Sequence, residues 1–237
     1  MSKGIMFQNC AYPIREATVS AYEDVWQQLA QSGPFWSGAD RMAIVREARN
    51  SLQCKLCSQR KDALSPAAVQ GEHDTVTELP LAAIEVIHRI RTDPARMTKS
   101  VLDAARTAGL SDGAYVELIG IVATSVVIDT FHQSLGLPVP ATQAGSTAPP
   151  LGADPTVEVV DGGAWVKIAP GDGELNEIGI PRQANIVRSM GLVPAVIVLF
   201  FSVMRQAYYI SGLPIAISRS QAEFIAARVS ALNQCFY

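Results

Sequence analysis

The chain has 237 residues, of which 49% are hydrophobic and 17% are charged, and its formal net charge is -3. A chain of this length and composition can bury a core of its own, which excludes disorder throughout. The slightly acidic balance excludes the broad positive surface that nucleic-acid binding requires, so we expect no nucleic-acid partner.

The first residues carry Lys3, but no apolar run of the length of a secretory signal follows. The longest apolar stretch, Leu192 to Met204, contains Pro194 and Ser202 and is shorter than the roughly 20 residues that span a bilayer. We therefore expect a buried core helix there and no membrane partner. Four cysteines do not make the dense disulfide framework of a small secreted domain, which favours a cytoplasmic protein.

Hydrophobic residues recur at helical spacing along the first 140 residues. Val19, Tyr22 and Val25 begin such a series in a helix predicted over Arg15–Gln31, which Gly33 and Pro34 end. The same spacing predicts three further helices, Asp40–Leu52, Cys54–Ala63 and Leu81–Ile90. The longest predicted helix begins at Ser111-Asp112 and ends near Leu135, before Gly136 and Pro138.

Glycine, proline and small polar residues crowd the stretch from Ala141 to Ile178, which we interpret as a linker. Alternation at Ala164–Ile168 predicts one short strand inside it. Helices are predicted again afterwards, at Arg182–Met190, Pro194–Ile210 and Ser218–Asn233.

The pair Cys54 and Cys57 is the one complete chemical signature in the sequence. Two thiols three residues apart at the start of a helix lie close enough for a disulfide, and the helix N-terminus and Lys55 favour a thiolate. The pattern therefore predicts a redox pair. Half of a zinc site, or two structural cysteines, are the alternatives. Zinc needs two more ligands, and Cys10, His73 and Cys235 show no metal-binding spacing, so we predict no metal and no cofactor.

A second unit of similar order ends the chain. Alignment of Cys54 with Cys235 matches Gln53 with Gln234, and a helix precedes each cysteine.

Polar residues also interrupt the apolar helices. These are Glu117, Asp129 and His132. Asp129 and His132 share a helix face and suggest either an acid and histidine pair facing Cys54 or a polar stripe, whereas His88 is interpreted as a packing histidine.

The stretch from Glu223 to Tyr237, with Arg182–Leu213 before it, resembles the alkylhydroperoxidase D and carboxymuconolactone decarboxylase family in its peroxidase-related branch. Glu223 lies twelve residues before Cys235, the spacing of that family's acid and first cysteine. Asp40–Lys61 and Gly109–Pro140 resemble the same family. The resemblance implies an all-α helical bundle, with one complete unit (1–140), a linker (141–178) and an incomplete second unit (179–237).

The resemblance also implies catalytic roles for Cys54, Cys57, Glu223 and Cys235 in hydroperoxide reduction, with an electron-donating thiol partner and a homo-oligomer. In the first unit Met42 holds the position of the acid and Lys61 that of the family's histidine, so a proton relay is not expected there.

A non-catalytic oligomerisation or partner-binding scaffold is the competing hypothesis. A lactone decarboxylase is a third, but that branch does not need the cysteine pair.

Overall fold

A computed structural model of the chain describes residues 5–171, 185–207 and 216–232. These residues form helices joined by loops and short 3-10 turns, with no strand among them, which confirms the all-α prediction. The helices are α1 (Glu16–Leu29), α2 (Gly38–Asn50), α3 (Lys55–Asp62), α4 (Leu81–Thr92), α5 (Lys99–Thr107), α6 (Asp112–Ser134), α7 (Asn185–Met190), α8 (Pro194–Ala207) and α9 (Arg219–Leu232).

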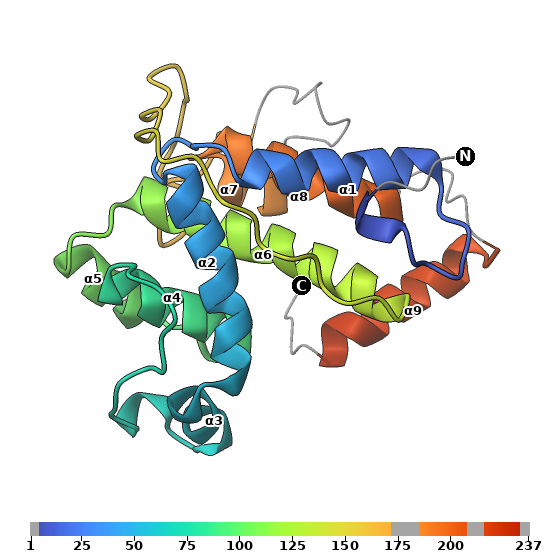
Figure 1. The fold of residues 1–237 in the computed structure, drawn as a ribbon. Coiled ribbons are helices and arrows are strands. Elements are labelled where there is room, and N and C mark those ends of the chain that lie inside the picture. Colours follow the sequence, from blue (N-terminus) through green and yellow to red (C-terminus); the bar gives the residue numbers. More distant parts are fainter. Residues whose placement is uncertain (1–4, 172–184, 208–215, 233–237) are drawn as a thin grey trace.

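Helix α6 runs through the middle of the molecule and contacts α2, α4 and α8 (Figure 1). It has the predicted ends: the Ser111 side chain accepts a hydrogen bond from the Ala114 amide, and Gly136 follows the helix with a φ of 71°. By length and composition α6 could cross a membrane, but 61% of its apolar window is buried inside the protein, as in a core helix.

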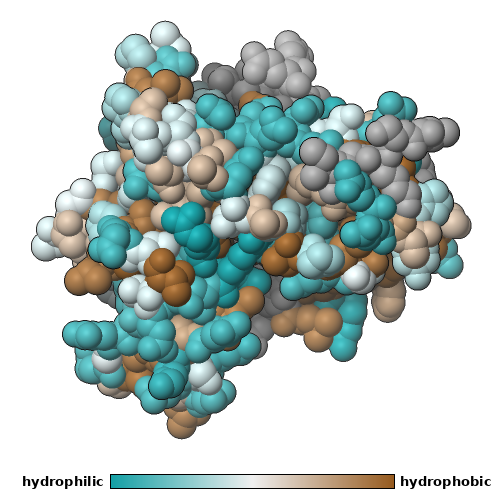
Figure 2. Space-filling model, viewed as in Figure 1, coloured by the Kyte–Doolittle hydropathy of each residue, from teal (hydrophilic) through white to brown (hydrophobic). Residues whose placement is uncertain are grey.

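The core extends from the N-terminal residues to α8. Val196 and Val203 of α8 are fully buried in the same cluster as Leu29 of α1 and Ile121 of α6. Helix α8, whose stretch was predicted to be a buried core helix, thus completes the core of the preceding helices. On the face in Figure 2, hydrophobic residues are scattered among hydrophilic ones.

The part of the predicted linker that the structure describes lies against the loop between α1 and α2. Ser146 donates its amide to the Ala30 carbonyl at 2.8 Å and accepts from the Ala39 amide at 2.8 Å. The predicted strand at Ala164–Ile168 is wrong: one isolated bridge joins Ile168 to Val160, and no strand forms. The segment is therefore fixed to the helices by backbone hydrogen bonds along part of its length.

Gly120 brings α6 close to α8. A Cβ atom at this position would lie 2.5 Å from Val196 Cβ. Because valine is β-branched, the Val196 side chain cannot easily rotate to relieve this contact. We expect Gly120→Ala to lower the free energy of unfolding by about 1–3 kcal/mol through overpacking, although alanine favours helices. Chemical denaturation measures the change. The control is Thr130→Ala on the exposed side of α6, and a stabilised Gly120→Ala protein would contradict the close contact.

Candidate functional site

The predicted cysteine pair begins α3. Helix α2 ends at Asn50, the 3-10 turn Ser51–Gln53 follows, and Cys54 precedes α3 in an extended conformation (φ -67°, ψ 124°). Cys57 lies in the first turn of α3. Both residues are buried, at 2% and 5% exposure, so this turn presents its two sulfurs to the interior.

Two histidines from distant parts of the chain contact these sulfurs. His88 of α4 places its Nδ1 atom 3.2 Å from Cys57 Sγ. His73, in the loop before α4, places its Nδ1 atom 3.5 Å from Cys54 Sγ and 3.6 Å from Cys57 Sγ. The four ligand-type atoms all lie within 4.8 Å of one another. We call these four residues the Cys-His cluster.

A carboxylate orients each histidine of the Cys-His cluster. The second ring nitrogen of His88, Nε2, lies 2.9 Å from Glu47 of α2, and that of His73 lies 2.7 Å from Glu85 of α4. A carboxylate only accepts hydrogen bonds, so each Nε2 carries the hydrogen. When either ring is neutral, its Nδ1 atom directs a lone pair at sulfur, and when the ring is protonated, Nδ1 donates a hydrogen bond to sulfur.

Backbone amides stabilise a thiolate at Cys54. Burial alone would raise the pKa of this thiol, but hydrogen bonds from the Cys57 amide, from His73 and from the Asp74 amide outweigh it, and the pKa is lowered. The chain turn that buries this sulfur therefore also supplies donors for its charged form.

The two histidines have opposite shifts. Burial would lower the pKa of His73, but hydrogen bonds with Cys57, Glu85 and Cys54 outweigh burial and raise it to about 10. Burial lowers the pKa of His88, despite its hydrogen bond with Glu47. His88 is therefore the histidine that favours the neutral, proton-accepting form.

Two arginines surround Glu85 on the outer side of His73. Arg60 Nη1 lies 3.0 Å from both carboxylate oxygens of Glu85, and Arg89 Nε lies 2.8 Å from one of them. The Glu85 carboxyl has a pKa well below its usual value, because hydrogen bonds with His73 and both arginines outweigh its burial. Glu85 is thus an ionised acceptor that fixes the His73 ring.

A cavity of about 340 Å³ lies next to this ion-pair network. Arg60, Glu85, Arg89 and Gln70 supply its polar lining, and α5 contributes small side chains. None of the four cluster residues lines it, so the cavity reaches Arg60 and Glu85 but not the Cys-His cluster itself.

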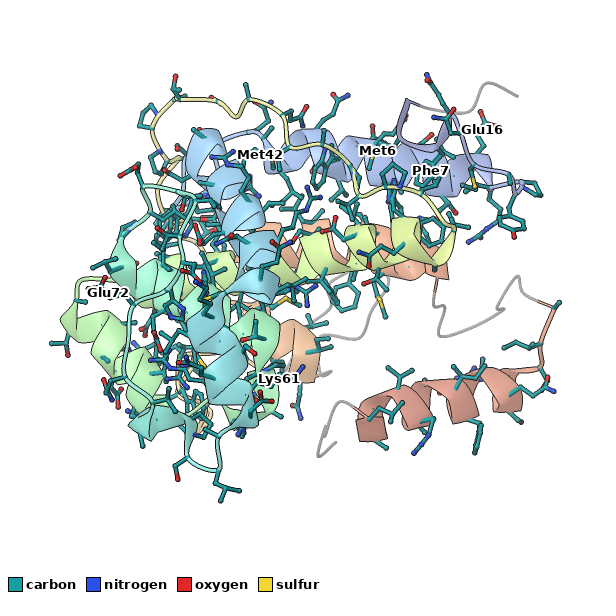
Figure 3. The ribbon with its side chains drawn as sticks, turned by 60° about the horizontal axis from the view of Figure 1, so that its bottom comes forward. Met6, Phe7, Glu16, Met42, Lys61 and Glu72 are labelled. Carbon is teal, nitrogen blue, oxygen red and sulfur yellow. The ribbon has the colours of Figure 1, made fainter. Side chains whose placement is uncertain are left out.

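The other predicted site residues lie elsewhere or outside the described residues. Glu223 lies in α9, 3.5 Å from Arg219, and α9 is separated from α3 in Figure 1. Cys235 lies outside the described residues. Met42 lies near the start of α2, far from Lys61 at the end of α3 (Figure 3).

The predicted acid and histidine pair on α6 does not face Cys54. Asp129 accepts hydrogen bonds from Arg49 at 2.6 and 2.8 Å. His132 lies 2.8 Å from the Ile128 carbonyl and stacks on Phe7. Glu117 forms an ion pair with Arg41. These three residues therefore serve structural contacts.

The structure corrects two expectations about the cluster. His73 is not isolated from the other candidate ligands, and His88, which is fully buried as a packing histidine is, also contacts a cysteine. The first unit was also expected to lack an acid and a histidine; Glu47 and His88 supply both from other positions. A sequence signal existed, because His88 shares the buried face of Ile84 and Ile87, where a polar side chain needs a partner.

Comparisons of the chain with protein-family models, curated proteins and solved structures give no match. The functional argument therefore rests on the geometry of the Cys-His cluster.

Proposed function

We propose that the chain is a dithiol oxidoreductase that reduces hydroperoxides, with Cys57 as the nucleophile and Cys54 as the resolving cysteine. The 3.2 Å contact between Cys57 Sγ and His88 Nδ1 carries the proposal, because it places a base against the sulfur that must lose a proton. Glu47 holds the ring of His88 and stabilises the imidazolium that forms.

The first step transfers oxygen to Cys57. His88 takes the thiol proton, and the thiolate attacks one peroxide oxygen. The sulfur–oxygen bond forms while the oxygen–oxygen bond breaks, and the departing alcohol or water takes the proton from His88. Cys57 is then a sulfenic acid, oxidised by two electrons.

The second step forms the disulfide. The Cys54 thiolate attacks the sulfur of the sulfenic acid, the sulfur–sulfur bond forms, and the hydroxyl leaves as water after gaining a proton. The lowered pKa of Cys54 and the separation of at most 4.8 Å between the cluster atoms support this step. An external thiol or dithiol partner supplies two electrons and restores both thiols.

The burial of both sulfurs favours a small substrate. Cys54 and Cys57 are almost inaccessible, so hydrogen peroxide or a small alkyl hydroperoxide is favoured over a bulky one. The family resemblance adds a homo-oligomer to the proposal, and the sparse cysteines add a cytoplasmic, reducing environment.

Peroxide treatment of the reduced protein tests this function. We expect one disulfide, Cys54 to Cys57, detected by mass spectrometry of non-reduced peptides. Cys57→Ser should form no such bond, whereas Cys10→Ser, which changes a buried cysteine of the main core, should behave like the wild type. If the wild type forms no disulfide and Cys57→Ser consumes peroxide equally, the scaffold hypothesis replaces the enzymatic one.

A further inference from the structure

We propose that Cys54, Cys57, His73 and His88 together bind one zinc ion in a closed tetrahedral site. This inference goes beyond the proposed peroxide reduction and does not depend on it. Two thiolates and two imidazoles are a ligand set that selects zinc, and four protein ligands leave no open position for a substrate.

The spacing of the donor atoms fits this ion. Zinc bonds of about 2.3 Å to sulfur and about 2.0–2.1 Å to nitrogen, at tetrahedral angles, place a sulfur and a nitrogen ligand roughly 3.5 Å apart. Three of the four sulfur–nitrogen pairs in the Cys-His cluster lie 3.5, 3.6 and 3.2 Å apart, and all four donor atoms lie within 4.8 Å of one another. Three donor pairs are therefore already at ligand spacing, and the other pairs are close to it.

The carboxylates behind the two histidines match the surroundings of a metal site. Metal-binding histidines commonly donate their other ring nitrogen to a carboxylate, which fixes the ring and increases its basicity. His73 has Glu85 in this role and His88 has Glu47. Both Nδ1 atoms are thus held towards the same point between the sulfurs.

The charges of the cluster balance around a divalent cation. One zinc ion neutralises the thiolates of Cys54 and Cys57. Glu85 and Glu47 carry two negative charges, and Arg60 and Arg89 carry two positive charges, so these four side chains balance one another. A buried cluster with this balance avoids the cost of an uncompensated interior charge.

Zinc binding and a disulfide between Cys54 and Cys57 exclude each other at these sulfurs. When peroxide oxidises the loaded site, the two thiolates give two electrons, a sulfur–sulfur bond forms, and the peroxide takes two protons from solvent and leaves as two waters. The zinc ion loses both sulfur ligands and is released. Oxidation of the loaded pair would therefore be accompanied by zinc release.

The experiment uses the full chain, purified without chelators. We expect about one zinc per chain by elemental analysis. After the zinc is removed, cobalt(II) should bind one to one, with the visible bands of a tetrahedral ion and a thiolate-to-cobalt charge-transfer band. Removal of one ligand, as in Cys54→Ser or His73→Gln, should abolish these bands.

Two further variants keep the test decisive if a ligand variant does not fold. Glu85→Gln leaves all four ligands in place and should weaken zinc binding about 10- to 100-fold. Cys10→Ser should bind zinc like the wild type. An octahedral cobalt spectrum, unchanged binding by Glu85→Gln and His73→Gln, or equal loss in Cys10→Ser would overturn the zinc site.

The metal and redox proposals fail separately. Stoichiometric zinc with no disulfide after metal removal and peroxide treatment would support the metal site and reject the oxidoreductase. Disulfide formation in a wild-type protein that gives no tetrahedral cobalt spectrum would do the opposite.

Discussion

Replacement of His88 by glutamine should slow peroxide-dependent disulfide formation by about 100- to 10,000-fold. Glutamine can still hydrogen-bond to Glu47, but it has no basic nitrogen to take the proton of Cys57, 3.2 Å away in the wild type. Stopped-flow measurement of a single turnover on reduced, metal-free protein separates this chemical step from the supply of electrons.

Two other variants show whether the loss comes from the proton relay. Glu47→Gln keeps His88 in place but removes the charge that stabilises its imidazolium, so a smaller loss is expected. His132→Gln changes a buried histidine that contacts Ile128 and Phe7 and should leave the rate unchanged. A His88→Gln protein that reacts as fast as the wild type would show that Cys57 loses its proton by another route.

The sequence predicted those features that depend on neighbouring residues. Helix α6 begins and ends as its Ser111 cap and Gly136 indicated, since a helix end is a local property. Helix α5 was not predicted, although Leu102 and Ala105 mark its buried face. It is a short element between longer ones, and two buried positions give a weak periodic signal.

The Cys-His cluster could be predicted only in part, because half of it depends on long-range contacts. The pair Cys54 and Cys57 is visible as spacing within one turn. His73 and His88 reach it from 16 and 31 residues beyond Cys57, and no local pattern encodes that approach. Glu47 was not predicted either, because the family pattern places the acid at position 42, which is Met42.

Glu47 and His88 could have been found by a different argument. Each is a polar residue on a buried helix face, and neither is exposed at all. A buried carboxylate needs hydrogen-bond donors, and a buried imidazole needs a partner for each nitrogen. Two such residues on neighbouring helices of one core are therefore expected to meet.

Replacement of Arg41 by methionine should lower the free energy of unfolding by about 3–5 kcal/mol at neutral pH. Arg41 is 4% exposed and lies 3.5 Å from Glu117, which is fully buried. Methionine preserves much of the apolar stem but leaves the Glu117 carboxylate without its counter-charge. It also removes the hydrogen bonds from Arg41 to the Gln28 and Gln31 carbonyls. Urea denaturation measures the loss.

The pH dependence identifies the uncompensated carboxylate as the cause. Burial raises the pKa of Glu117 even beside Arg41, so the folded chain holds this proton more tightly than the unfolded chain. Stability from that proton is present below the ordinary glutamate pKa of about 4.3 and is lost as pH rises through the raised value. Without Arg41 the pKa rises further, so the deficit of Arg41→Met should be larger at pH 8 than at pH 5.

A second substitution at Glu117 separates charge from packing. Glu117→Gln removes the buried charge yet keeps an oxygen that can accept from the Phe35 amide, which donates to Glu117 at 2.6 Å. The double variant of Arg41→Met and Glu117→Gln should therefore recover much of the stability that Arg41→Met loses. The difference between the deficits at pH 8 and pH 5 should disappear in it. Lys99→Met, at an exposed ion pair with Asp103, should have no measurable effect. If Arg41→Met loses equal stability at both pH values and Glu117→Gln restores none, packing and the lost carbonyl contacts account for the change.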